Sequence, residues 1–231
     1  MKASPNEAAV LWTGGKDSSL ALYETMLLSC RNVRLVTFAP RDARFLAHPL
    51  KIMKYQAEAL HLPHEVLEVG EPFEKSYRSA IACLNRTRGV SAVVTGDITE
   101  VDGIPNWMEQ CCDGLGIRVL KPLWGRSREQ LLGTFVSAGF KAVFSCVKKP
   151  WFTEQWLGAE LDRACIERLR ELKRSSGIDI CGENGEYHTL VLDGPLFRKR
   201  LELTAFRRRT DADVMYLDIE EARLLEKSPA G

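Results

Sequence analysis

Residues 13–19 read TGGKDSS and combine turn-forming, charged and hydroxyl side chains directly after a short apolar run. The glycines lack a Cβ atom, so the backbone can turn sharply and bring its N–H groups close to a ligand. A helix beginning within this stretch would add unpaired N–H groups and the positive end of its dipole, which attract phosphate. The same pattern is also typical of a plain capped turn. The candidate anion-binding residues are Thr13, Gly14, Gly15, Lys16, Asp17, Ser18 and Ser19.

Asp17 is an unusual residue for a turn that binds only an anion. Its carboxylate could cap the helix, or it could bind the Mg²⁺ that accompanies a polyphosphate. Two other phosphate motifs do not fit this chain. G-x-x-x-x-G-K-[ST] is absent here, and the GLG at 114–116 lacks both the third glycine and the preceding strand of a dinucleotide site.

A second cluster of reactive side chains lies in GENGEYHT, residues 182–189. Its glycines, with Gly185 among them, permit a tight path. Glu183 and Glu186 could accept hydrogen bonds from ammonium, orient an amine or hold a metal, because carboxylates bind cations and donors. The alternative is a turn with surface acids before a strand. His188 could act as a general base for ammonium or could be structural.

Composition limits the class of protein. The 231 residues are 45% hydrophobic and 27% charged with a net charge of +1, which is typical of an ordinary soluble protein and disfavours nucleic acid as a partner. No apolar run is long enough to cross a bilayer. Seven cysteines without a C-x-x-C pair indicate buried thiols in a reducing compartment, so we expect a cytoplasmic protein.

Strand-like and helix-like segments alternate in the first two thirds of the chain. This alternation predicts an α/β fold, with a parallel sheet covered by helices on both faces. The carboxyl ends of all its strands then share one edge, where ligands bind. Expected strands are 8–13, 33–39, 64–69, 91–97, 118–123 and 141–147, and expected helices are 18–28, 49–60, 73–86, 104–112 and 127–139.

Two further pairs of residues end expected strands at that edge. Gly96 and Asp97 follow the fourth strand, where Asp97 could meet the nucleotide or its metal, or simply form a turn. Thr37 and Phe38 end the second strand, which is a natural seat for adenine through backbone contacts and an apolar face.

The pattern changes after about residue 150. A long helical stretch, 153–177, is followed by alternating segments at 190–197, 199–209 and 212–226 that predict antiparallel strands. We therefore expect a nucleotide-binding domain at 1–125 and a smaller α+β acceptor domain at 126–231, with the boundary between 124 and 152. The basic clusters 198–200 and 207–209 are either a solvated face or a dock for an acidic protein or RNA.

The stretch TGGKDS at 13–18 resembles the S-G-G-x-D-S PP-loop of ATP pyrophosphatases, with Thr13 in place of serine. That resemblance implies a PP-loop (adenine nucleotide alpha hydrolase-like) fold. It also implies that the loop holds the β- and γ-phosphates while a nucleophile attacks the α-phosphorus, splitting ATP into AMP and pyrophosphate. Donors on the departing pyrophosphate would stabilise charge that develops in the transition state, and Mg²⁺ would contribute similarly.

Three more stretches, KPLWGR (121–126), EQWLGAELD (154–162) and GENGEYHTLVLDGPLF (182–197), resemble diphthine–ammonia ligases. Asn184 and His188 differ from the G-E-G-G-E-[FY]-E-T of the archaeal and eukaryotic ligases, and the segment after TGDI differs too. The chain therefore looks more like a bacterial-type branch of the family. The resemblance implies that ATP activates a carboxylate as an acyl adenylate, from which ammonia displaces AMP.

These resemblances imply catalytic roles for Lys16, Asp17, Glu183 and Glu186, with Asp17 as the metal ligand. The candidates for the acceptor pocket are His48, Trp124, Arg126, Trp156, Gly185 and His188. Ammonia or another amine, a carboxylate on a protein or small molecule, ATP and Mg²⁺ are the expected partners, and the chain could form a homodimer. Two alternatives stay open: a PP-loop enzyme that modifies tRNA, and an ATP-binding or ATP-sensing module without turnover.

Overall fold

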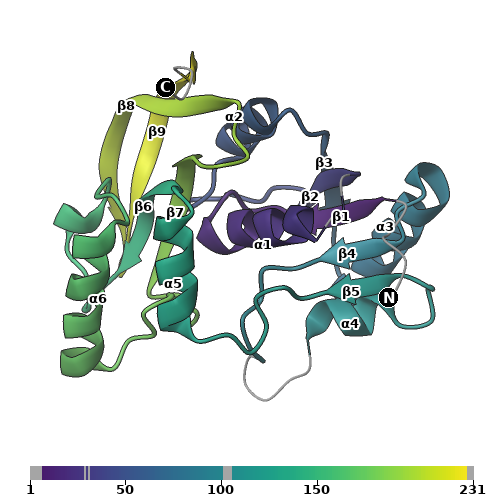
Figure 1. Cartoon of the computed structure of the whole chain (residues 1–231), viewed down its shortest axis with the longest axis horizontal. Coiled ribbons are helices and arrows are strands. Elements are labelled where there is room, and N and C mark those ends of the chain that lie inside the picture. Colours follow the sequence, from purple (N-terminus) through teal and green to yellow (C-terminus); the bar gives the residue numbers. More distant parts are fainter. Residues whose placement is uncertain (1–6, 29, 31, 101–105, 228–231) are drawn as a thin grey trace. The chain divides into compact units, whose positions relative to one another are not determined.

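The computed structural model describes residues 7–28, 30, 32–100 and 106–227 (Figure 1). Two compact units divide the chain. The first consists of the residues up to Thr13 together with Asp17–Ala43 and Leu62–Gly125, and the second of Gly14–Lys16, Arg44–His61 and the residues from Arg126 onward. The second unit therefore includes three residues of the glycine turn.

The first unit is built on a five-stranded sheet in which every pairing is parallel. Its strand order is β3-β2-β1-β4-β5, which confirms the α/β fold with a parallel sheet. The order reverses between β1 and β4, and sheets of this kind bind ligands at such a point. The strands are β1 (Ala8–Leu11), β2 (Val33–Pro40), β3 (His64–Val69), β4 (Ala92–Val94) and β5 (Arg118–Leu120).

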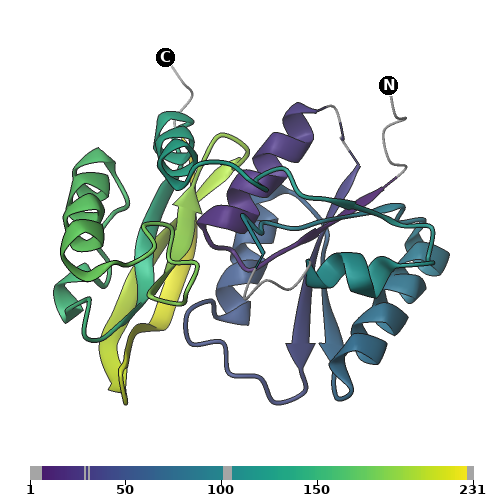
Figure 2. The ribbon, with the colours of Figure 1, turned by 90° about the horizontal axis from the view of Figure 1, so that it is seen from below.

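Helices cover both faces of this sheet, as predicted. The helix α1 (Lys16–Leu27) lies on one face, and α3 (Phe73–Arg88) and α4 (Trp107–Cys112) lie together on the other (Figure 2). Ile81 of α3 and Met108 of α4 share an apolar core with Val93 of β4. Residues 104 and 105, predicted to begin the fourth helix, lie outside the described residues.

The second unit contains a four-stranded antiparallel sheet in the order β7-β6-β9-β8. Its strands are β6 (Lys141–Lys148), β7 (Tyr187–Asp193), β8 (Lys199–Asp211) and β9 (Val214–Glu226). Among its helices, α2 (Leu50–Leu60) packs against β8 and β9, while α5 (Arg128–Ser137) and α6 (Arg163–Ser176) contact each other. The expected strand at 141–147 exists, but it pairs with β7 and β9 rather than extending a parallel sheet.

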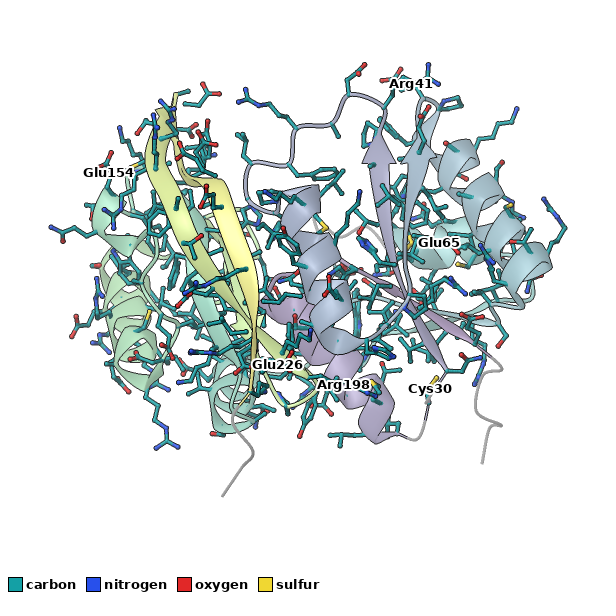
Figure 3. The ribbon with its side chains drawn as sticks, turned by 90° about the horizontal axis from the view of Figure 1, so that it is seen from above. Cys30, Arg41, Glu65, Glu154, Arg198 and Glu226 are labelled. Atoms are coloured by element: carbon teal, nitrogen blue, oxygen red, sulfur yellow. The ribbon has the colours of Figure 1, made fainter. Side chains whose placement is uncertain are left out.

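The end of α2 is fixed within this unit by the loop before β8. The N–H group of Arg198, labelled in Figure 3, donates to the Ala59 carbonyl at 2.7 Å.

The prediction of one helix over 153–177 was wrong. Only a 3₁₀ turn, η1 (Glu154–Trp156), and α6 are helical. Gly158 takes a φ of +82° between them, and Leu157 and Glu160 form isolated bridges to β6. The Asp162 side chain then caps α6 by accepting a hydrogen bond from Cys165 N at 2.7 Å. Pairing with β6 therefore outweighs the local helical preference of this stretch.

All seven cysteines are free thiols, and Cys83 alone is exposed among them. Burial raises the pKa of both Cys111 and Cys112 to about 11, so neither thiol is activated as a nucleophile. In the described part of the chain, no helix combines the length and apolarity needed to cross a membrane.

The basic cluster 207–209 carries acidic partners on the neighbouring strand. Arg207 pairs with Glu220 at 2.6 Å and Arg209 with Asp218 at 3.2 Å across the hairpin of β8 and β9. This cross-strand neutralisation favours the solvated-face interpretation over RNA docking.

Candidate nucleotide and acceptor site

The end of β4 and the start of α1 approach each other closely at the point where the strand order reverses. A Cβ atom added at Gly96 would lie 2.9 Å from the backbone carbon of Asp17 and 3.0 Å from Ser18 N. These are backbone atoms, which cannot move aside as the end of a flexible side chain can. The sequence predicted that both segments would meet at the carboxyl edge, and the first unit brings them into contact there.

Gly96→Ala is therefore expected to lower the free energy of unfolding by about 1–3 kcal/mol, the usual cost of overpacking. It should also raise the KM for ATP, because α1 must shift at its first turn. Urea denaturation and ATP titration check both effects. Gly133→Ala is the matched control, since its Cβ meets no atom within 4 Å and alanine is favoured in a helix. Equal stability of the two variants would contradict the predicted clash.

The hydroxyl groups of the turn lie at the start of α1. Thr13 Oγ1 and Ser18 Oγ are hydrogen-bonded at 3.2 Å. The Ser19 hydroxyl and the Trp12 Nε1–H are buried, and within the described residues neither has a hydrogen-bond partner. Buried polar groups usually have partners, so these two orphaned groups fit a missing polar ligand such as a polyphosphate.

Thr37 and Phe38 lie where β2 continues beyond the last residue of β1. Leu11 pairs with Val36, whereas Thr37–Pro40 pair only with β3. The Thr37 hydroxyl donates to the Trp12 carbonyl at 2.7 Å, and the Phe38 ring packs on Tyr77 with centroids 4.4 Å apart. Both side chains thus help to build the strand end that was predicted to seat adenine.

Asp97 is exposed next to Gly96, and one of its carboxylate oxygens accepts a hydrogen bond from the Asn106 side chain. Within the described residues, no group of three or more His, Cys, Asp or Glu side chains is arranged to hold a metal ion. A donor set of one or two carboxylates fits Mg²⁺, which commonly binds through a few carboxylates, phosphate oxygens and water.

The remaining turn residues, Gly14–Lys16, contact β7 and the loop before it in the second unit. Lys16 N donates to Thr189 Oγ1 at 3.1 Å, so one of the helix-start amides predicted to bind anions is held by a hydroxyl. The Lys16 ammonium donates to the Cys181 carbonyl and lies 5.3 Å from the centre of the Tyr187 ring. Within the second unit, Lys16 is therefore in direct contact with residues of the GENGEYHT motif.

Glu186 organises the loop before β7. Its carboxylate is 2% exposed and accepts hydrogen bonds from Asp179 N at 2.8 Å, Asn184 N at 3.0 Å and Asn184 Nδ2 at 3.1 Å. Gly182 must be glycine here, because a Cβ atom would lie 2.7 Å from the Tyr187 carbonyl oxygen. Glu183 is half-buried and Gly185, with a φ of +77°, is exposed on the same loop.

His48 and His188 lie edge to face with their ring centroids 5.5 Å apart, although 140 positions separate them in the chain. Burial, together with the smaller effects of the nearby charges of His188 and Lys16, lowers the pKa of His48 to about 3. His48 is therefore a neutral ring at physiological pH, which suits an uncharged contact to a substrate.

This pKa makes the stability of the protein depend on pH. The unfolded chain protonates His48 near its ordinary pKa of 6.5, whereas the folded chain does so only at about 3. The stabilising contribution of neutral His48 is complete above 6.5 and is lost progressively as the pH falls toward 3. His48→Phe keeps a ring against His188 and should flatten this decline. Urea denaturation at several pH values checks it, and parallel declines would contradict it.

Each of the other acceptor candidates makes its own local contacts. Trp124 carries the Lys121 ammonium 4.1 Å from its ring centre, and Arg126 Nη2 donates to Thr134 Oγ1 at 3.5 Å. Trp156 packs in an aromatic cluster with Phe144 and Phe152, at centroid distances of 5.2 and 5.1 Å. Trp156 is thus a core residue of the second unit.

Two polar side chains that the sequence did not single out form hydrogen bonds to the turn. Thr189 binds Lys16 N, and the Gln56 side chain donates to the Gly14 carbonyl at 2.9 Å. Thr189 belongs to a motif already noted. Gln56 is a polar residue on the apolar face of a helix. That placement is the only feature of the sequence that could have indicated its role.

Together these features define an α/β nucleotide-binding protein with a PP-loop and a second, α+β unit. Comparison with protein families agrees with this class. Residues 6–119 match the diphthamide synthase N-terminal domain, and residues 127–225 match the diphthamide synthase C-terminal domain. The chain belongs to the diphthamide synthase family.

Two individual ligases point the same way. A diphthine–ammonia ligase of Danio rerio is 36% identical, with 84% of this chain and 85% of the relative aligned. The ligase of Schizosaccharomyces pombe is 29% identical over 91% of this chain, which spans only 38% of that longer relative. A solved structure described as a predicted subunit of tRNA methyltransferase from Methanocaldococcus jannaschii has a TM-score of 0.45 and 17% identity, covering 82% of this chain and 97% of its own.

Proposed function

We infer that this protein is an ATP-dependent carbon–nitrogen ligase of the diphthine–ammonia ligase type. It cleaves ATP to AMP and pyrophosphate, adenylates a carboxylate and forms an amide with ammonia. The observation that carries this inference is the contact of Gly96 with the backbone of Asp17 and Ser18 at the reversal of strand order, where only a glycine fits.

For ATP, we propose that the turn residues 13–19 bind the β- and γ-phosphates through backbone N–H groups, hydroxyls and the Lys16 ammonium. Adenine would lie on the backbone of Thr37 and Phe38, with Gly96 and Asp97 beside the phosphates. Donors already oriented on the departing pyrophosphate stabilise the charge that develops there as the α-phosphorus is attacked.

Asp17 is the proposed ligand of Mg²⁺, and Asp97 is a second carboxylate at the same edge of the sheet. When bound, the ion would neutralise phosphate charge. The half-buried position of Asp17 in the first turn of α1 supports this role, because its carboxylate also benefits from the helix dipole.

For the acceptor, we propose that Glu183 orients ammonia or another amine. Glu186 keeps the loop in shape, and His48, His188 and Gly185 contribute contacts to the carboxylate substrate. Trp124, Arg126 and Trp156 would shape the surrounding pocket indirectly. In domain terms, residues 1–125 would bind ATP and 126–231 would bind the acceptor, although Gly14–Lys16 and Arg44–His61 pack with the latter. A cytoplasmic location and a homodimer belong to the same proposal.

The test is incubation with Mg²⁺, ammonium and ATP labelled on the α-phosphate, with candidate carboxylates that include a diphthine-bearing protein. We expect labelled AMP, unlabelled pyrophosphate and no ADP, with turnover that depends on the acceptor. Release of ADP would contradict the proposal. ATP binding without turnover for any acceptor would favour the sensing module, and turnover stimulated by tRNA would favour a tRNA-modifying enzyme.

A further inference from the structure

Gln56 is a fully buried polar side chain on α2, with 0% of its surface exposed. It lies on the same buried face of the helix as Ile52, Met53 and Ala57. A carboxamide transferred from water into such surroundings costs free energy unless it forms hydrogen bonds. The hydrogen-bond partners of Gln56 therefore indicate its structural role.

The Gln56 amide nitrogen donates to two backbone carbonyls, Gly14 O at 2.9 Å and Val191 O at 2.7 Å. Val191 N also donates to Gly14 O at 2.9 Å, so the first loop glycine is held from a helix and a strand at once. The two acceptors fix the orientation of the carboxamide, because turning it over would set its oxygen against both carbonyls. Gln56 Oε1 then lies 2.0 Å from the position of a Cβ at Gly14, and the left-handed φ of +76° also favours glycine there.

Holding the Gly14 carbonyl also determines where the next N–H group points. The peptide plane between Gly14 and Gly15 is rigid and trans, so its C=O and N–H groups point in opposite directions. With the carbonyl turned toward Gln56 and Val191, the Gly15 N–H is turned away from them. The φ of +76° at Gly14 belongs to the same arrangement.

We propose that Gln56 is a positioning residue of the PP-loop, which orients the Gly14–Gly15 peptide for binding the terminal phosphates of ATP. This inference rests on the proposed ATP site at residues 13–19. Gln56 acts through the backbone of the loop and does not itself contact the nucleotide. Its removal should therefore weaken binding of ligands that occupy the loop and spare ligands that do not.

Gln56→Met, which keeps the length of the side chain but removes both donors, tests this. We expect the affinities for ATP and pyrophosphate to fall about 10- to 100-fold. This is the factor expected if the reoriented Gly15 N–H loses its hydrogen bond to a charged phosphate. The affinity for AMP should be unchanged, because AMP lacks the terminal phosphates. The KM for ATP should change more than kcat. Calorimetric titration with each ligand measures this split. Ile52→Val on the same helix is the control, since it disturbs packing of the helix without removing a hydrogen bond to the loop.

Gln56→Glu is a second variant of nearly the same shape, which replaces the donor by an acceptor and adds a negative charge. It should weaken pyrophosphate binding more than Gln56→Met does. If neither variant folds, amide hydrogen exchange on the wild type decides. Pyrophosphate should slow exchange in residues 9–24 and 50–60 together, and slowing confined to 9–24 would contradict the proposal.

Two failures are distinguishable. A wild-type protein that binds no pyrophosphate would overturn the proposed function. Wild-type binding that Gln56→Met and Gln56→Glu leave unchanged would overturn only the role of Gln56.

Discussion

Replacing Asp17 by alanine is expected to lower ATP cleavage about 100- to 1000-fold, the loss typical of removing one preorganised electrostatic contact. Asp17 lies in the first turn of α1, and its backbone lies directly beside Gly96, two residues after the end of β4. The fold should persist, because a first-turn acid contributes only about 0.3–1 kcal/mol through the helix dipole. Release of labelled AMP measures the activity, and urea denaturation measures the free energy of unfolding.

Two controls separate a metal ligand from a general loss of charge. Asp17→Asn should recover part of its activity as the Mg²⁺ concentration rises, because an amide oxygen is a weaker ligand. Asp42→Ala removes an exposed acid in the turn after β2 and should leave activity unchanged. Wild-type rates of AMP release in Asp17→Ala would contradict the assignment.

Lys16→Ala is a less direct test of the same turn. The Lys16 side chain is only 6% exposed, and its ammonium donates to the Cys181 carbonyl. A variant at this position would lose both a charge for phosphate and a contact that holds the loop before β7. Lower activity in Lys16→Ala therefore needs a parallel measurement of stability before a catalytic role is assigned.

Local patterns in the sequence predicted the first unit well. The alternation of apolar strands and amphipathic helices identifies all five parallel strands, and the glycines of the turn and of TGD indicate which strand ends meet. Both signals depend on neighbours in the chain and on the shared edge of a parallel sheet. The contact between Gly96 and the start of α1 follows from them.

The second unit depends on contacts between distant parts of the chain, and a local pattern carries no record of these. KAVFSCV has the apolar character of a central strand, but nothing in it distinguishes a parallel neighbour from the antiparallel partners β7 and β9. The assignment of Arg44–His61 to this unit depends on the packing of α2 against β8 and β9. Sequence periodicity shows that α2 has an apolar face, but it does not show which sheet this face covers.

The acidic residues of GENGEYHT illustrate the same limit within a site. Glu183 and Glu186 have the same side chain and lie three positions apart, so both qualify as candidates from the sequence. In the fold Glu186 is buried and accepts hydrogen bonds from the loop backbone, while Glu183 is half-buried. Replacing Glu186 should therefore lower stability, whereas replacing Glu183 should mainly lower activity.

Glu186→Ala is expected to lower the free energy of unfolding by about 2–3 kcal/mol, because the N–H groups of Asp179 and Asn184 lose a charged acceptor. Glu183→Ala should lower it by less, because this side chain is only half-buried. Its amide formation should nevertheless fall about 100-fold or more, the contribution of a positioned acid or base. Urea denaturation measures the first effect, and incorporation of labelled ammonium measures the second.

ATP–pyrophosphate exchange in the presence of the acceptor separates the two steps of the reaction. Glu183 is proposed to orient the amine, so Glu183→Ala should keep the exchange that reports adenylation and lose only transfer to ammonia. Glu186→Ala should lose both in proportion to the fraction unfolded, because its carboxylate holds the loop that precedes β7. A Glu183→Ala protein that forms the amide at the wild-type rate would remove this residue from the acceptor site. A Glu186→Ala protein that is as stable as the wild type would show that the loop does not depend on its carboxylate.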